Sequence, residues 1–203
     1  LYRYKSLKFD HGGVALEQGF AIVADIGKTH ARLSLWSRAG RMLDRVTRAN
    51  APITTDEYPA LDTAATAQWL IETLPRFAGH PIEVIIPVAH GAAVAGIRGG
   101  VLAFVPPDYE WDIPEVQLAG YRTQRDSFAV TGSPALPGGL NIGAQLHVID
   151  TIRSGIFRDA TLLPYAQYWA WLLSGEAGSE VTSLGCHSDL WVPGIADFSP
   201  LAK

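Results

Sequence analysis

The sequence has 203 residues, of which 48% are hydrophobic and 18% charged, so it can bury a core and is too apolar for a disordered tail. Lys and Arg number 16 against 20 Asp and Glu, and the net charge of −4 leaves no broad basic face for a phosphate backbone. We therefore expect a globular protein without a nucleic-acid partner.

Cysteine content and charge spacing bear on compartment and membrane. The lone Cys186 has no disulfide partner within the chain, which favours a reducing compartment such as the cytoplasm. The longest stretch without Asp, Glu, Lys or Arg, residues 127–149, contains Pro134, Pro137 and the Gly138-Gly139 pair, which would break a spanning helix. No signal peptide opens the sequence, and we expect no membrane partner.

Both ends suggest a piece of a longer chain. The sequence begins at Leu1 and its only methionine is Met42, so residues 1–18 are interpreted as a lead-in segment or a cloning remnant. Residues 198–203 supply no closing element of the kind that a complete domain usually has.

The next part of the chain predicts a mixed sheet and a helix. Residues 20–24 and the period-two run 33–36 predict a β-hairpin, and residues 42–46 predict a third antiparallel strand. Apolar residues then take helical spacing, from an acidic start at residues 55–57 to Phe77, with Gly79 as the stop. Residues 82–88 predict a buried strand and 101–105 another, so the fold class is α/β with a mixed sheet flanked by helices.

The remainder predicts mainly helices. Residues 114–139 carry helix fragments and a Gly/Pro loop, and helices are expected at 141–157 and 165–173, the second closed by Ser174-Gly175. Residues 179–184 suit a last strand or a turn. The aromatic residues Tyr168, Trp169 and Trp171 have helical spacing and are predicted to pack in the core rather than to stack on a sugar.

The tip of the first hairpin is the strongest candidate for chemistry. In the run from Asp25 to Thr29, backbone N–H groups, a lysine and a hydroxyl can surround a phosphate while Asp25 orients a hydrated cation. The alternative is a polar turn in which Gly27 takes a positive φ. A Walker A loop is excluded, because Ile22 stands where that loop needs glycine and a strand follows in place of a helix.

The hairpin from Ala24 to Leu33 resembles the first phosphate-binding hairpin of sugar kinases of the FGGY family. Three later segments resemble that family in the same order: residues 137–146 the loop and helix after the sugar site, residues 163–175 the following helix, and residues 180–183 the late Thr-Asn/Ser segment. The chain is most similar to the rhamnulokinase-like and fuculokinase-like branch.

This resemblance implies an actin-like ATPase (ribonuclease H-like) fold and ATP-dependent phosphorylation of a sugar hydroxyl with Mg²⁺. Residues 19–203 would form the N-terminal sugar-binding domain, without the C-terminal ATP-binding domain, and a homodimer is allowed. Asp25 would hold the metal through water, and Gly27, Lys28, Thr29 and Arg32 would contact the phosphate.

The resemblance also implies sugar-binding residues, namely His90, Asn141 and Gln145, whose side chains suit hydroxyl groups. Alternatively Asn141 caps a helix and Gln145 faces solvent. Gly91 and Ala92 replace the charged pair of the glycerol kinase branch, which argues against glycerol. Second-rank candidates are Asp108, Tyr109 and Glu110, whereas Cys186 and His187 make a poor zinc site.

The catalytic base of the family is an aspartate expected beyond Lys203, since Asp197 comes too early and lacks its context. Two other functions stay open. The chain is a non-catalytic sugar-binding module of the actin-like type, or a nuclease of the ribonuclease H type with Asp25 as a metal ligand, although such sites gather several carboxylates.

Overall fold

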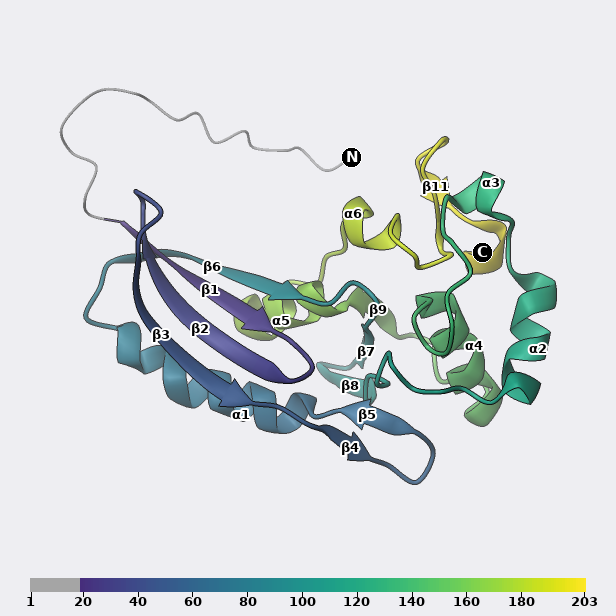
Figure 1. Ribbon diagram of the computed structural model, residues 1–203, viewed down its shortest axis with the longest axis horizontal. Coiled ribbons are helices and arrows are strands. Elements are labelled where there is room, and N and C mark those ends of the chain that lie inside the picture. Colours follow the sequence, from purple (N-terminus) through teal and green to yellow (C-terminus); the bar gives the residue numbers. More distant parts are fainter. Residues whose placement is uncertain (1–18) are drawn as a thin grey trace.

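The computed structural model describes residues 19–203, so the proposed lead-in segment, residues 1–18, lies outside the described residues. The elements fall into two regions (Figure 1). A four-stranded sheet with two helices forms one region, and short strands and several helices form the other. This arrangement confirms the predicted α/β class.

The main sheet has the strand order β3-β2-β1-β6. Strands β1 (Phe20–Ile26), β2 (His30–Ser37) and β3 (Met42–Ala49) form an antiparallel meander, as predicted. Strand β6 (Ile82–Ala89) pairs with β1 in parallel, so the sheet is mixed. Because β1 and β6 run the same way, their carboxyl ends meet at one edge of the sheet.

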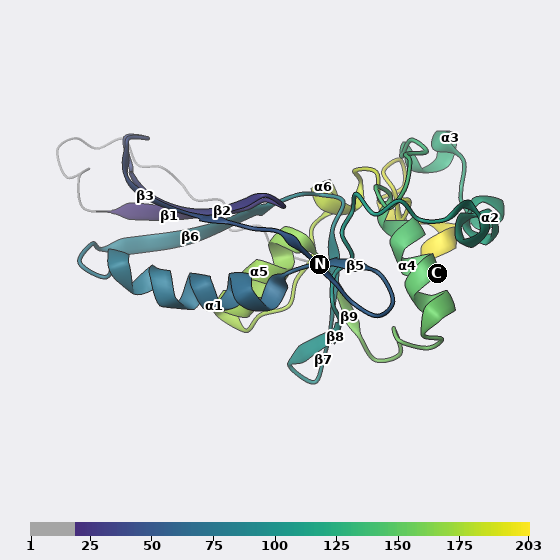
Figure 2. The same cartoon turned by 60° about the horizontal axis from the view of Figure 1, so that its bottom comes forward.

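One face of this sheet carries the core. The side chains of Ile22, Ile26 and Leu33 are buried, and the covering helices are α1 (Thr63–Thr73) and α5 (Tyr165–Ser174). Figure 2 shows both helices on the same side of the sheet. In α5 the side chains of Tyr168 and Trp169 are buried, which confirms their predicted place in the core.

The prediction that residues 82–88 form a buried strand is half wrong. The strand exists, but Val84, Ile86 and Val88 are 43–46% exposed. These residues alternate with half-buried ones, because β6 is an edge strand and the helices cover one face only. An unbroken apolar run therefore did not mean burial on both faces.

The predicted acidic helix start at residues 55–57 is also wrong. These residues form the turn of a hairpin between β4 (Pro52–Thr54) and β5 (Pro59–Leu61), in which the Thr55 hydroxyl donates to the carbonyl of Tyr58 over 2.7 Å. Helix α1 begins at Thr63, where a carboxylate oxygen of Asp62 accepts the Ala65 N–H over 3.0 Å. A short 3₁₀ helix, η1 (Leu74–Phe77), follows α1.

A second, three-stranded sheet has the order β8-β7-β9. Strand β8 (Val101–Phe104) was predicted, whereas β7 (Val94–Arg98) and β9 (Thr161–Pro164) were missed. Their short runs carry little periodicity, and the pairing of β7 with β9 joins residues far apart in the sequence.

The remaining elements surround α4 (Ile142–Ile152), the first of the two predicted late helices, which ends well before the predicted end at residue 157. They are α2 (Glu115–Gln124), α3 (Phe128–Thr131), α6 (Val181–Leu184), β10 (Trp191–Val192), β11 (Asp197–Phe198) and η2 (Pro200–Ala202). Residues 181–184 are therefore a helical turn and not a strand. Over residues 19–203, no helix is long and apolar enough to cross a membrane.

Candidate functional site

The hairpin tip and His90 lie at the same edge of the main sheet. Ile26, the last residue of β1, pairs with Ala89, the last residue of β6, so residues 27–29 and His90 leave adjacent parallel strands. In open α/β sheets, ligands bind beyond the carboxyl ends of the strands. A ligand-binding site is therefore expected at this edge.

The backbone at the tip is braced from the end of β3. Asn50 donates its side-chain amide to the carbonyl of Gly27 and its backbone N–H to the carbonyl of Thr29, each over 2.9 Å. The N–H groups of Lys28 and Thr29 have no acceptor among residues 19–203. Two free N–H groups in sequence suit an anion. The prediction missed Asn50, because only the sheet brings it to the tip.

Gly27 is required at the tip by a close approach. Its φ is not positive, contrary to the alternative of a positive-φ turn, but an added Cβ would lie 3.0 Å from the carbonyl oxygen of His30. The Gly27 N–H donates to that same oxygen over 2.9 Å. A side chain here would require the backbone of His30 to shift by a few tenths of an ångström where the hairpin closes.

Asp25 and Arg32 face each other across the hairpin. They are register partners in β1 and β2, and an Arg32 nitrogen lies 3.1 Å from one carboxylate oxygen of Asp25. The two side chains are about two-fifths exposed, which leaves Asp25 open to water. No group of three metal-ligating side chains occurs in the described chain. Asp25 thus fits a hydrated cation held through water, and no cluster of several carboxylates surrounds it among residues 19–203.

The ammonium group of Lys28 pairs with acidic residues of a distant segment. This group lies 3.0 Å from a carboxylate oxygen of Asp108, bonds to Glu110 and lies 5.8 Å from the ring centre of Tyr109. The three second-rank candidates therefore meet the hairpin tip. They lie on the segment after β8, where Asp108 donates its N–H to the carbonyl of Pro59 over 2.9 Å.

His90 stacks on Tyr109, with ring centres 4.0 Å apart and planes 9° apart. Its Nδ1 accepts the Ala92 N–H over 3.0 Å, so this nitrogen is unprotonated in the fold. Partial burial and the nearby His187, 6.4 Å away between ring centres, lower the pKa of His90. Tyr109 is buried, whereas His90 is exposed, so a neutral imidazole with hydrogen-bonding capacity is held at this edge, which suits a sugar hydroxyl.

The other two predicted sugar residues are buried and hold backbone. Gln145 is fully buried, so it does not face solvent, and its amide nitrogen donates to the carbonyls of Ala92 and Gly139. Its side-chain oxygen has no partner among the described residues. Gln145 therefore joins the turn after His90 to the loop before α4.

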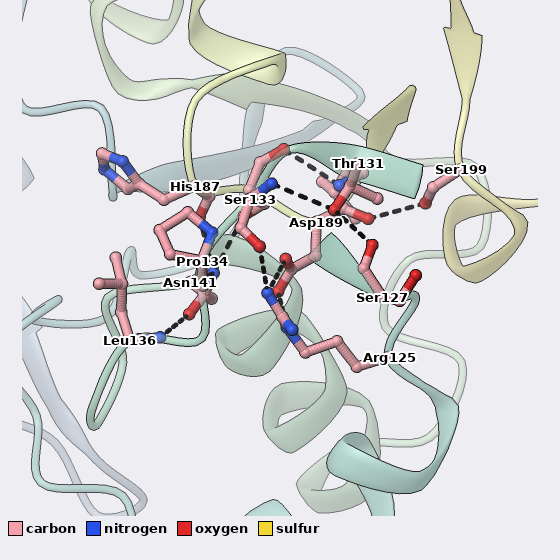
Figure 3. Close-up of polar contacts among 12 residues, drawn as sticks. Arg125, Ser127, Thr131, Ser133, Pro134, Leu136, Asn141, His187, Asp189 and Ser199 are labelled. Atoms are coloured by element: carbon pink, nitrogen blue, oxygen red, sulfur yellow. Dashed lines mark hydrogen bonds and ion pairs between the residues drawn. The ribbon is translucent and has the colours of Figure 1, made fainter. Parts of the chain in front are cut away.

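Asn141 precedes α4, but its side chain makes no capping bond. It accepts the Leu136 N–H over 2.8 Å and donates to the carbonyls of Pro134 and His187 over 3.0 and 3.2 Å (Figure 3). These contacts fix the loop before α4 and the backbone of His187. The structure thus brings together the hairpin tip, His90 and Tyr109, with Asn141 and Gln145 one layer behind them.

A buried ion pair lies next to Asn141, since both Arg125 and Asn141 bond to Ser133. Two nitrogens of Arg125 bond to the carboxylate of Asp189 over 3.0 and 2.9 Å, and Asp189 has no exposed side-chain surface (Figure 3). Arg125 also donates to the carbonyl of Ser133 over 2.5 Å. The pair was not predicted, since nothing in the sequence links residues 64 positions apart.

Known structures share this fold. A carbohydrate kinase from Novosphingobium aromaticivorans is 54% identical over a match that covers 93% of this chain and 40% of that protein, with a TM-score of 0.87. A xylulose kinase from Lactobacillus acidophilus matches 90% of this chain and 38% of its own length at 16% identity and a TM-score of 0.74. Glycerol kinase from Plasmodium falciparum, solved with ADP, matches 90% and 39% at 8% identity with a TM-score of 0.74.

A comparison with protein-family models finds no match, and a search of curated proteins finds none either. The chain spans about 40% of the length of the kinases it resembles. Over that span it has the mixed α/β, actin-like ATPase fold of carbohydrate kinases, which confirms the predicted fold class.

Proposed function

We propose that this chain supplies the sugar site and the first phosphate hairpin of a carbohydrate kinase of the FGGY type, which transfers a phosphoryl group from ATP to a sugar hydroxyl. The observation that carries the proposal is the 54% identity, over 93% of the chain, to a carbohydrate kinase. Residues 19–203 are proposed as its N-terminal domain. We further propose that the kinase belongs to the rhamnulokinase-like and fuculokinase-like branch.

The hairpin tip is proposed as the phosphate side of the site. Bound Mg²⁺-ATP supplies the transferable phosphoryl group, and such a transfer relies on positioning and on charge stabilisation. The free N–H groups of Lys28 and Thr29 can donate to phosphate oxygens, and Arg32, which pairs with Asp25 over 3.1 Å, would contact the same phosphate. Asp25, open to water, would hold the metal's water shell.

The edge formed by His90 and Tyr109 is proposed as the sugar side. The exposed imidazole of His90 rests on the buried ring of Tyr109, and Asn141 and Gln145 fix backbone segments on either side. The base that deprotonates the sugar hydroxyl is proposed to come from outside this sequence, since Asp197 is bonded to Lys203 over 2.6 Å.

The test is ADP release by the full-length protein with a panel of ketoses, deoxyketoses and polyols. We expect turnover with a particular sugar, and no turnover with any of them counts against kinase function. Asp25→Asn should lower kcat by about 100-fold, because it removes a charge that acts during transfer. Asp44→Asn is the matched control, since Asp44 lies on β3 of the same sheet and pairs with Arg76 of η1. This variant should change kcat by less than about twofold.

A second candidate function is a non-catalytic sugar-binding module. It is favoured by the absence, among residues 19–203, of a group of three or more His, Cys, Asp or Glu side chains that could hold a metal ion. Calorimetry separates the two candidates: ATP that tightens sugar binding supports the kinase, and sugar binding that nucleotide leaves unchanged supports the module.

A further inference from the structure

The side chain of Lys28 joins the hairpin tip to acidic residues of another segment. Only 16% of that side chain is exposed, and only 8% of the side chain of Asp108, its partner at 3.0 Å. Glu110, the other partner, is 62% exposed. The contact with Asp108 is therefore a largely covered ion pair, which salt screens less than a fully exposed pair.

The positive charge of Lys28 is already neutralised. Burial by itself would lower the pKa of Lys28, but the hydrogen bonds to Glu110 and Asp108 and the charges of both carboxylates raise it above its ordinary value. One ammonium group faces two carboxylates, so a phosphate that approached this ammonium would meet a net negative cluster. The free N–H groups of the tip carry no such cost.

The partners of Lys28 lie on the segment that carries the sugar-side stack. Asp108 accepts the Glu110 N–H over 3.0 Å with one carboxylate oxygen and contacts Lys28 with the other. Tyr109, between these two acidic residues, stacks on His90. Lys28 thus joins the hairpin tip to the segment that places Tyr109 against His90.

We propose that Lys28 is a positioning residue: its ammonium group ties the phosphate hairpin to the Tyr109 segment of the sugar side and does not itself bind phosphate. The inference rests on the proposed kinase function for its kinetic test, but its structural test does not. It predicts that removal of the ammonium group loosens the sugar side and leaves nucleotide affinity unchanged.

The structural test is hydrogen exchange on the full-length protein. Lys28→Met should speed exchange of the N–H groups of Asp108, Glu110 and Trp111 by about 10-fold, and Lys28→Arg should restore much of their protection. Arg38→Met is the matched control, because Arg38 bonds to Glu83 at the opposite end of the same sheet. Faster exchange throughout α1 as well would mean general destabilisation and would overturn the local role.

The kinetic test uses whichever sugar the panel identifies. Lys28→Met should raise the KM for that sugar about 10-fold with the KM for Mg²⁺-ATP unchanged, and Asp108→Asn should act in the same direction. Glu110→Gln should have a weaker effect, because Glu110 is mostly exposed. A rise in the KM for ATP alone, with unchanged exchange at residues 108–111, would show that the ammonium group of Lys28 binds phosphate and would overturn the proposal. If the wild-type protein turns over no sugar, kinase function fails while the exchange result still decides the role of Lys28.

Discussion

The imidazole of His90 is held neutral by its surroundings. Its Nδ1 accepts the Ala92 N–H, it is partly buried against Tyr109, and His187 is close enough to repel a second positive charge. The pKa of His90 is therefore lowered from its ordinary value of about 6.5. The neutral form stabilises the fold above about pH 6.5, and this contribution is lost as pH falls through the lowered pKa.

An NMR titration of the His90 ring tests this environment. We expect a pKa below about 6.5, and His187→Gln should raise it, because the repelling charge is gone. Glu110→Gln should shift the pKa of His90 further down, since the Glu110 carboxylate favours the charged form. Equal titration of His90 in all three proteins would show that the ring is free in water and that the stack on Tyr109 does not persist.

Helix α1 shows how one residue sets the start of an element. Asp62 accepts the Ala65 N–H over 3.0 Å, whereas Asp56 lies exposed in the preceding hairpin turn. Both are acidic residues before an apolar pattern, so the sequence alone does not separate them. The hydrogen bonds of Thr55 hold residues 55–58 in a turn, so the helix begins after Asp62 and not after Asp56.

Replacement of these two aspartates separates the cap from mere negative charge. Asp62→Ala should lower the free energy of unfolding by about 1 kcal/mol through loss of the N-cap bond. Asp56→Ala should change it by less than about 0.5 kcal/mol. Urea denaturation measures both values, and equal effects of the two variants would contradict the assigned helix start.

Across the whole molecule, the Arg125–Asp189 pair joins the end of α2 to the C-terminal part of the chain. Asp189 is fully buried, and Tyr121 also donates its hydroxyl to this carboxylate. Burial and the neighbouring Asp189 raise the pKa of Tyr121, so the phenol stays protonated and keeps its role as a donor. The same region supports Asn141 and the backbone of His187 (Figure 3).

Removal of the Asp189 charge should therefore reach the candidate site as well as stability. Asp189→Asn leaves Arg125 buried without its counter-charge and should lower the free energy of unfolding by about 3 kcal/mol. It should also shift the His187 ring resonances. Asp197→Asn is the control, because that residue pairs with Lys203 on the surface and its loss should be nearly neutral. If Asp189→Asn leaves the free energy of unfolding unchanged, the pair does not hold the two segments together.

Local pattern was enough for much of the fold. The hairpin of β1 and β2, strand β3 and helix α5 were predicted from period and from Gly175, whose positive φ of 77° ends α5. Each of these elements depends on residues that are close in the chain. The short strands β7 and β9 were missed, because they are stabilised by pairing with distant residues and carry little pattern of their own.

The sequence by itself determined the fold class, the hairpin tip and the residue types that suit phosphate and sugar. Only the tertiary structure decided what each side chain does there. Asn141 and Gln145 are used to hold backbone, and Lys28 is drawn to Asp108 and Glu110. The physical reason is that a side chain's role depends on which charges and unpaired polar groups surround it, and β1, the segment after β8 and α4 meet only when the chain folds.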